Sequence, residues 1–303
     1  MGKLSKDKRD IFYRRAKELG YRARSAFKLL QLDKEFDLLS DATRAVDLCA
    51  APGSWSQVLA SRLSSNHSSN SSSNSSSTPP CVVSVDLQAM APIPGCTILQ
   101  GDITSSSTAT KIISNFHGLR AHIVICDGAP DVTGLHDIDE YIQGQLLLAA
   151  VNITTHVLEE NGTFVAKIFR GRDVNLLYDQ LRILFKRVSI AKPTSSRNSS
   201  IEAFVVCQGF KGGDYNDLPL EGGFGGEGSG GLTDPSMHKT ERDRFAVPFI
   251  ACGDLDGKEG EVPVEGFLDA DRSYDVDEGK EGLKAVQPPI KPPYETHSNL
   301  KEK

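Results

Sequence analysis

Residues 46–57 read VDLCAAPGSWSQ. An apolar run leads into a turn of small residues that contains Pro52 and Gly53, and a helical pattern follows directly. A turn of this kind brings the backbone amides at the start of the helix close to a ligand. It carries neither G-x-G-x-x-G nor G-x-x-x-x-G-K-[ST], which counts against a dehydrogenase or a P-loop NTPase. The stretch therefore indicates a nucleoside pocket without a phosphate cradle.

Short apolar runs alternate with helical patterns on both sides of this stretch. The runs predict strands at residues 44–49, 81–86, 96–100, 122–127, 163–169, 187–191 and 201–208. The helical patterns predict helices at residues 55–63, 108–116, 140–158 and 174–185. Strands separated by helices form a mostly parallel sheet with helices on both faces, whereas the short loop 192–200 requires antiparallel pairing. We expect a seven-stranded, Rossmann-like α/β sheet of the kind used by methyltransferases, with an antiparallel last strand.

Composition divides the chain into three parts. Residues 1–43 form a basic arm with a helix, residues 44–209 form the core, and residues 210–303 form an acidic extension rich in Gly and Pro. Within the core, residues 64–78 hold thirteen Ser or Asn in fifteen positions, which predicts a disordered insertion. The extension contains one apolar island, residues 245–252, which we expect either to fold back on the sheet or to dock on a partner.

The basic arm contrasts with the rest of the chain. Residues 1–34 hold eleven Lys and Arg against four Asp and Glu, although the whole chain has a net charge of −6. Local basic charge favours a polyanionic partner such as RNA, but a solvated helix face is an equally good interpretation of charge alone. The candidate RNA contacts are Arg14, Arg15, Arg22 and Arg24.

Several classes of protein are disfavoured by what the sequence lacks. No apolar run approaches the roughly 20 residues that a membrane-spanning helix needs, and the first residues are charged where a signal peptide would be apolar. The six cysteines include no C-x-x-C pair, so we expect neither a disulfide framework nor a metal site. We expect a cytoplasmic protein that does not enter a membrane.

Acidic residues lie in or directly after the first three predicted strands, namely Asp47, Asp86 and Asp102. Ligands of open α/β sheets bind at the carboxyl ends of the strands. Asp86 is placed to accept both hydroxyls of a ribose, and Asp102 to accept from an adenine amino group. Taken singly, each is more often a turn or helix-capping residue. Together they favour a nucleoside that carries positive charge.

A second group of charged residues interrupts apolar segments. Asp127 ends the fourth predicted strand, Lys167 lies inside an apolar strand where an ammonium needs a partner, and Glu202 opens the antiparallel strand. All three therefore meet at one edge of the sheet, either as a functional site or as a structural salt-bridge cluster. Lys28 lies at the inner end of the basic arm, in a helix that Ser25 is predicted to cap.

The chain resembles the FtsJ-like RNA ribose 2′-O-methyltransferases from Lys3 to Gln208, apart from the Ser/Asn insertion. The matching stretches are residues 22–29, 47–57, 126–131, 165–167 and 199–202. The resemblance implies a catalytic tetrad formed by Lys28, Asp127, Lys167 and Glu202. It also implies contacts to S-adenosylmethionine from Gly53, Trp55, Asp86, Asp102 and Asp127.

Residues 3–10 and 131–141 are similar to the eukaryotic tRNA-directed branch of that family. This branch methylates anticodon-loop nucleotides 32 and 34 and works with a separate partner protein for each position. The alternatives are a ribosomal RNA ribose 2′-O-methyltransferase and a non-catalytic RNA-binding subunit.

The chemical role of Lys167 also stays open at this point. Burial near Lys28 would favour the neutral form, so Lys167 would act as a general base. If the two carboxylates dominate instead, Lys167 stays cationic and stabilises the developing alkoxide.

Overall fold

The computed structural model describes residues 10–70, 81–130, 136–171, 174–213, 247–253, 270, 271 and 286. Its sheet has eight strands in the order β3-β2-β1-β4-β5-β7-β6-β8. The strands are β1 (Arg44–Leu48), β2 (Cys81–Asp86), β3 (Cys96–Gln100), β4 (Ala121–Cys126), β5 (Leu158–Phe169), β6 (Phe185–Pro193), β7 (Glu202–Phe210) and β8 (Phe249–Cys252). Only the pairs that involve β7 are antiparallel. The mostly parallel sheet with an antiparallel partner is confirmed, but it has one strand more than predicted.

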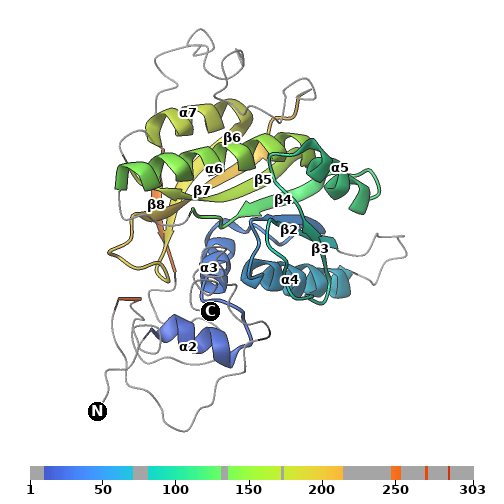
Figure 1. Cartoon of the computed structure of the whole chain (residues 1–303), viewed down its shortest axis with the longest axis horizontal. Helices are drawn as coiled ribbons and strands as arrows, with labels where there is room; N and C mark the ends of the chain where they lie inside the picture. The colour runs from blue at the N-terminus through green and yellow to red at the C-terminus, as the bar shows by residue number, and fades with distance from the viewer. Residues whose placement is uncertain are drawn as a thin grey trace, which may run out of the picture.

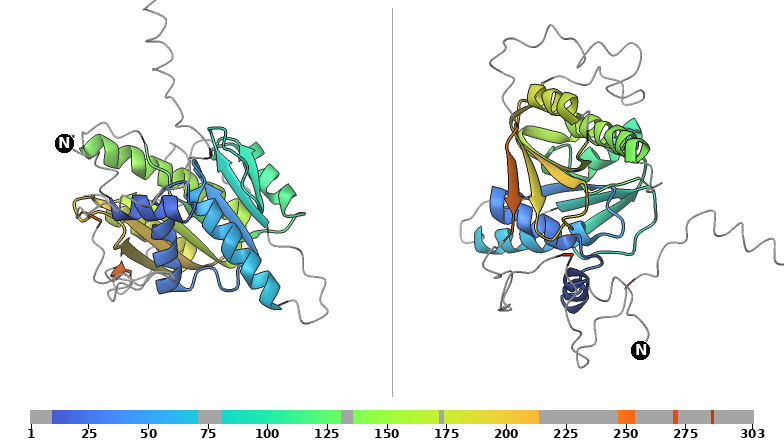
Figure 2. Two further views of the ribbon diagram at one scale, coloured as in Figure 1. Left: turned by 90° about the horizontal axis from the view of Figure 1, so that it is seen from below. Right: turned by 90° about the vertical axis from the view of Figure 1, so that its left-hand side faces the viewer.

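Helices cover both faces of the sheet, as expected (Figure 1). The helices are α2 (Ile11–Glu18), α3 (Ala26–Phe36), α4 (Ser54–Asn70), α5 (Ser106–Asn115), α6 (His136–Val157) and α7 (Val174–Leu184). Helices α3 and α4 lie on one face, and α5, α6 and α7 lie on the other (Figures 1 and 2). Helix α2 lies beyond α3, away from the sheet.

The alternation of side chains along the strands builds two apolar cores. Val124 of β4 packs on the side of α6 and α7, whereas its neighbours Ile123 and Ile125 pack on the side of α3 and α4. Because successive strand residues point to opposite faces, a strand that is covered on both sides must be apolar throughout. Burial of all three side chains explains why β4 reads as a continuous apolar run.

The first helix of the core is longer than the sequence indicates. Helix α4 continues to Asn70, seven residues past the predicted end, so the Ser/Asn-rich segment begins as helix rather than as a loop. Ser hydroxyls can bond back to the carbonyl four residues earlier without ending a helix, and Ser65 Oγ donates to Ser61 O at 2.9 Å. The remainder of the predicted insertion, residues 71–78, lies outside the described residues.

The apolar island of the C-terminal extension folds back on the sheet. Strand β8 pairs in parallel with β6, with Phe249 opposite Ile190 and Cys252 opposite Pro193. Cys252 is fully buried in the core on the side of α3, where Ile250 also packs. Of the two expectations for this island, the structure supports attachment to the chain's own sheet. Most of the remaining extension lies outside the described residues.

Two features bear on the classes of protein considered above. No helix in the described part of the chain is long and apolar enough to cross a membrane. All six cysteines are described, and each is a free thiol.

Candidate active site

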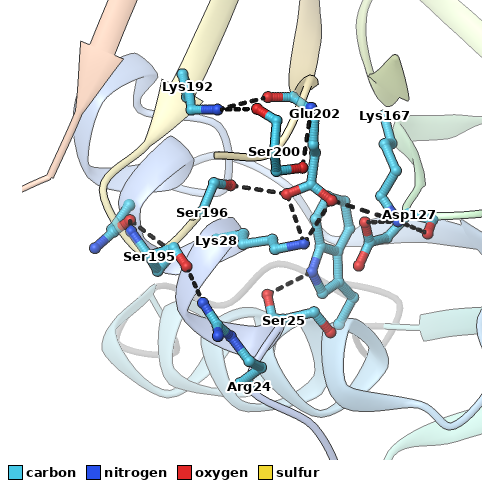
Figure 3. A network of polar contacts seen from close by, with 12 residues as sticks. Arg24, Ser25, Lys28, Asp127, Lys167, Lys192, Ser195, Ser196, Ser200 and Glu202 are labelled. Atoms are coloured by element: carbon cyan, nitrogen blue, oxygen red, sulfur yellow. Dashed lines mark hydrogen bonds and ion pairs between the residues drawn. The ribbon is translucent and has the colours of Figure 1, made fainter. Parts of the chain in front are cut away.

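Four charged side chains meet where β4 and β5 end and β7 begins (Figure 3). Lys167 Nζ lies 2.8 Å from Asp127 Oδ1 and donates to the Asp127 carbonyl at 2.7 Å. Lys28 Nζ donates to Glu202 Oε2 at 2.8 Å. Lys167 Nζ also lies 3.8 Å from Glu202 Oε2, which joins the two ion pairs. The structure thus brings together the four residues of the predicted tetrad, which come from α3, the loop after β4, β5 and β7.

Glu202 is the centre of this group. Burial by itself would raise the pKa of its carboxyl, but the charges of Lys28 and Lys167 outweigh this effect, and the pKa lies below its ordinary value. Ser196 Oγ also donates to Glu202 Oε1 at 2.8 Å. Glu202 is therefore held as a carboxylate that orients two ammonium groups at once.

The surroundings of Lys167 bear on the two roles that the sequence leaves open for it. Only 8% of the residue is exposed, and burial by itself would lower its pKa. The charges of Asp127 and Glu202 outweigh burial, so the pKa of Lys167 is raised. Of the two roles left open for Lys167, this arrangement favours the cationic one, because Lys28 is already paired with Glu202 and two carboxylates face Lys167.

Gln143 supports the same group, although the sequence analysis did not find it. Its Nε2 donates to the carbonyls of Gly128 at 3.2 Å and Lys167 at 3.0 Å, which ties the loop after β4 to β5. Gln143 is 3% exposed. The only feature of the sequence that could have indicated this role is a glutamine on the buried face of the helix after Asp127, and such a feature is a weak signal.

The turn after β1 has the tight backbone expected of a ligand-binding loop. Gly53 has a φ of +104°, and a Cβ there would lie 2.5 Å from Ile93 Cδ1 and 3.1 Å from Arg22 Nη1. Arg22 braces this turn, because its guanidinium donates to the carbonyls of Pro52, Ala91 and Pro92 at 2.8–2.9 Å. Arg22 therefore has a structural task in the pocket wall, which its place in a basic arm does not suggest.

The strand-tip carboxylates lie at the same edge of the sheet. Asp86 accepts from the backbone N–H groups of Ala51 and Gln88, both at 2.8 Å. Asp102 accepts from the backbone N–H and the hydroxyl of Thr104 at 2.8 and 2.7 Å. Each carboxylate oxygen has two lone pairs, so both residues keep capacity for a ligand hydroxyl or amino group.

Asp47 lies inside β1 and is buried, unlike the two carboxylates at the strand ends. It is 1% exposed and accepts from Ser56 Oγ at 2.6 Å, and Ser56 in turn accepts from Ser84 Oγ at 2.8 Å. Burial is the main cause that raises the pKa of Asp47, to about 7. Asp47 thus joins the start of α4 to β1 and β2 and does not itself face the ligand edge.

Trp55 and Ser25 take structural positions. The Trp55 side chain is 2% exposed, packs against Phe204 and donates from Nε1 to the Ser25 carbonyl at 2.7 Å. Its indole is thereby committed to the core, which leaves its backbone for a ligand. Ser25 is the N-cap residue of α3, as predicted, but its hydroxyl makes no capping hydrogen bond and instead bonds Ser54 Oγ at 2.7 Å.

The remaining arm arginines contribute differently. Arg24 pairs with the buried Asp10 and donates to the Ser195 carbonyl, so it ties the arm to the loop between β6 and β7. Arg197 of that loop also pairs with Asp10, at 3.2 Å. Arg15 is buried in α2, whereas Arg14 on the same helix is half-buried.

The described residues also limit which ions the site can hold. Within the ranges given above, no group of three or more His, Cys, Asp or Glu side chains is placed to hold a metal ion. The chemistry available at the edge is that of two ammonium groups, several carboxylates and a glycine-containing turn.

Comparison with known proteins identifies the family of this chain. The family model of the FtsJ-like methyltransferases matches residues 21–210 of the sequence. A Homo sapiens protein named tRNA (cytidine(32)/guanosine(34)-2′-O)-methyltransferase is 55% identical over 312 residues, covering 100% of this chain and 86% of the relative. A Schizosaccharomyces pombe protein of the same name is 52% identical over 305 residues, covering 99% and 98%.

A more distant relative and a solved structure extend the comparison. The AdoMet-dependent rRNA methyltransferase spb1 of Neurospora crassa is 43% identical over 209 residues, covering 69% of this chain and 24% of the relative. A Plasmodium falciparum crystal structure, described as a ribosomal RNA methyltransferase, has a TM-score of 0.54 and 25% identity, covering 64% of this chain and all of that one. The chain belongs to the FtsJ-like methyltransferase family.

Proposed function

We propose that this protein transfers a methyl group from S-adenosylmethionine to the ribose 2′-hydroxyl of tRNA, at anticodon-loop nucleotides 32 and 34. The observation that carries the proposal is the joined pair of ion pairs Lys28–Glu202 and Lys167–Asp127 at the carboxyl edge of the sheet. The names of relatives that match nearly the whole chain support the choice of tRNA and of these nucleotides.

The residues around the turn after β1 fit the cofactor. Gly53 keeps the turn free of a side chain, Asp86 provides a carboxylate for ribose hydroxyls, and Asp102 provides one for the adenine amino group. Asp127 pairs with Lys167 and directly follows β4, the strand beside β1, so its carboxylate suits a cationic sulfur. S-adenosylmethionine bound there would supply a methyl group on a positively charged sulfur, and this sulfur would become a neutral thioether as the bond from the methyl carbon to the ribose oxygen forms.

Lys167 acts in its cationic form in this proposal. Its ammonium, held by Asp127 and Glu202, donates to the 2′ oxygen and stabilises negative charge there as the hydroxyl loses its proton. The proton passes to the carboxylate of Asp127, which lies beside Lys167 Nζ. Lys28 contributes by keeping Glu202 ionised and in place, so much of the rate comes from positioning.

Two other candidate functions fit the observations less well. Acting on ribosomal RNA is the second candidate, because the Neurospora crassa relative is named for that substrate, but it matches only 69% of this chain. A non-catalytic RNA-binding subunit would have no need for one buried and one half-buried ammonium group, each paired with a carboxylate. We also propose that separate partner proteins select nucleotide 32 or 34, and that the reaction takes place in the cytoplasm.

Nucleoside mass spectrometry of RNA from cells that lack this protein tests the proposal. We expect 2′-O-methylcytidine at tRNA position 32 and 2′-O-methylguanosine at position 34 to disappear, and to return with the wild-type gene but not with Lys167→Met. Unchanged tRNA together with a loss of methylation in ribosomal RNA would overturn the choice of substrate. Full restoration by Lys167→Met would overturn catalysis by the tetrad.

A further inference from the structure

The edge of the sheet that carries the tetrad continues onto a surface that β8 completes. This surface, the tail-strand surface, consists of Arg170 directly after β5, Lys192 on β6 and Phe249 on β8. The Arg170 guanidinium lies over the Phe249 ring, with 5.7 Å between its central carbon and the ring centre. Phe249 is 53% exposed and Arg170 is exposed as well. An aromatic ring and a cationic side chain are thus exposed to solvent side by side.

The tail-strand surface is joined to the tetrad through the start of β7. Lys192 Nζ donates to the carbonyls of Ser200 at 2.7 Å and Glu202 at 3.3 Å (Figure 3). The Arg170 backbone N–H donates to the Ile201 carbonyl at 2.8 Å. The Lys192 ammonium and the Arg170 backbone therefore bind the three-residue segment that places the Glu202 carboxylate in the active site.

The tetrad and this surface lie on opposite sides of the same edge. Val165 of β5 and Phe204 of β7 pack on the side of α3. Lys167 and Glu202 lie two positions from them on the same strands, so their side chains lie on that side as well. Ile168 and Ile190 pack on the side of α7, which Arg170, Lys192 and Phe249 share by the same alternation. A strand of RNA that crosses the edge would meet both groups in succession.

We propose that the tail-strand surface binds the RNA nucleotide next to the one that is methylated, with its base stacked on Phe249 and its phosphate near Arg170 and Lys192. This inference rests on the proposed function, because it assumes an RNA substrate. Single-stranded RNA is bound by aromatic rings that stack on bases and by Arg and Lys that neutralise phosphates. The tail-strand surface supplies an aromatic ring and two cationic side chains, and two of its three residues bond the segment that carries Glu202.

A protein partner fits this surface less well than RNA does. Docking patches for proteins are contiguous and apolar, whereas Phe249 is a single ring that lies under the Arg170 guanidinium, with Lys192 on the neighbouring strand. Asp271 brings a carboxylate near Lys192, but that carboxylate accepts from the Asn198 N–H at 2.5 Å and from Ser199 Oγ at 3.3 Å. The exposed charge beside the ring is that of Arg170.

Binding of in-vitro transcribed tRNA to the full-length protein tests the inference, with cofactor affinity measured in parallel. We expect Phe249→Ala to weaken tRNA binding about 5- to 100-fold, since loss of one stacked base costs about 1–3 kcal/mol. Phe249→Tyr, which keeps the ring, should stay within about twofold. Arg170→Gln should reduce the slope of log affinity against log salt by about 0.7–0.9, the value for one phosphate. Cofactor affinity should not change in any of them.

Leu119→Ala provides the matched control, because Leu119 is also an exposed apolar residue but precedes β4 at the opposite edge. If Phe249→Ala binds tRNA like the control while the wild type methylates tRNA, the inference fails and the proposed function stands. If Phe249→Ala loses a co-purifying protein but keeps tRNA affinity, the surface binds a protein and the inference also fails. If the wild type binds and methylates ribosomal RNA but not tRNA, the proposed substrate fails, and weakened ribosomal RNA binding by Phe249→Ala would still support the surface.

Discussion

The carboxyl edge of the sheet is built in two halves that use different interactions. The half at β1, β2 and β3 is held by hydrogen bonds from neutral donors, such as the Ala51 N–H to Asp86, and by the Arg22 guanidinium on three backbone carbonyls. The half at β4, β5 and β7 is held by ion pairs, with Lys28 and Glu202 separated by 174 positions in the chain. Among the described residues, no ion pair involves Asp86 or Asp102 of the first half, whereas the second half pairs two ammonium groups with two carboxylates.

This difference matches what each half has to bind. Uncompensated carboxylates attract a cationic ligand, so the first half suits a sulfonium-bearing nucleoside. A balanced cluster leaves little net charge, yet places an ammonium where an oxygen anion develops. If this division is correct, substitutions in one half should alter cofactor affinity and substitutions in the other should alter the rate of methyl transfer.

The largest expected effect is that of Lys167→Met. We expect single-turnover methyl transfer to fall by about a hundredfold to ten-thousandfold, the range for loss of a group that acts on a transferred proton or developing charge. Cofactor affinity, measured by titration calorimetry, should stay within about threefold. A parallel loss of cofactor affinity would show that the two halves are not separate and that Lys167 is mainly structural.

The charge state of Lys167 can be tested on the wild-type enzyme. Because its pKa is raised, a cationic lysine with a carboxylate acceptor predicts a single-turnover rate that levels off below about pH 8. A neutral lysine base would make the rate rise about tenfold per pH unit through pH 9. A rise of that kind would contradict the cationic role and restore the general-base interpretation.

Asp47 should make the stability of the first half depend on pH. Its folded-state pKa of about 7 lies above the ordinary 3.8, so the unfolded chain loses this proton first and stability falls as the pH rises from about 4 to about 7. Asp47→Asn should remove this dependence and gain about 3 kcal/mol relative to the wild type between pH 5 and pH 8. The free energy of unfolding in denaturant at both pH values measures this gain. Parallel pH profiles for the two proteins would contradict the assignment.

Asp86→Ala should affect the first half directly. Loss of a carboxylate that accepts ligand hydroxyls costs about 1.5–3 kcal/mol, or about 10- to 100-fold in cofactor affinity. At saturating cofactor the methyl-transfer rate should recover to within about threefold of the wild type. A rate that stays low at saturation would mean that Asp86 also positions the second half.

The two halves also differ in how far the sequence predicted them. The strands and the residues at their tips follow from local patterns, and the meeting of Asp127, Lys167 and Glu202 follows from the strand directions. The addition of Lys28 to this group rests on the resemblance to the family. The roles of Arg22, Arg24 and Ser25 did not follow, because each bonds residues that are 29 to 171 positions away. The pKa direction of Lys167 depends on which partners lie closest, and periodicity carries no information on that.

The C-terminal strand shows the same limit. Apolar composition identified residues 245–252 as a segment that must be buried, but composition cannot say against which surface. The structure answers with four residues that extend the sheet beside β6. A short edge strand separated from the core by many residues gives no local signal of its partner, because its pairing is decided by the register and shape of the sheet.

The smallest expected effect separates the arm arginines that the charge pattern grouped together. Arg22 braces the turn around Gly53 through three carbonyls, so Arg22→Gln should weaken cofactor affinity, by about 3- to 10-fold for loss of charged hydrogen bonds that are partly exposed. Arg14 lies on α2, away from that turn, so Arg14→Gln should leave cofactor affinity unchanged. If it contacts a phosphate, it should lower the salt slope of tRNA binding by about 0.7–0.9. Calorimetry with cofactor and salt titration with tRNA measure both variants.

An unchanged salt slope for Arg14→Gln would return this residue to the solvated-face interpretation. Equal loss of cofactor affinity in both variants would mean that the arm acts on the pocket as one unit, through the packing of α2 on α3 and not through the contacts of Arg22.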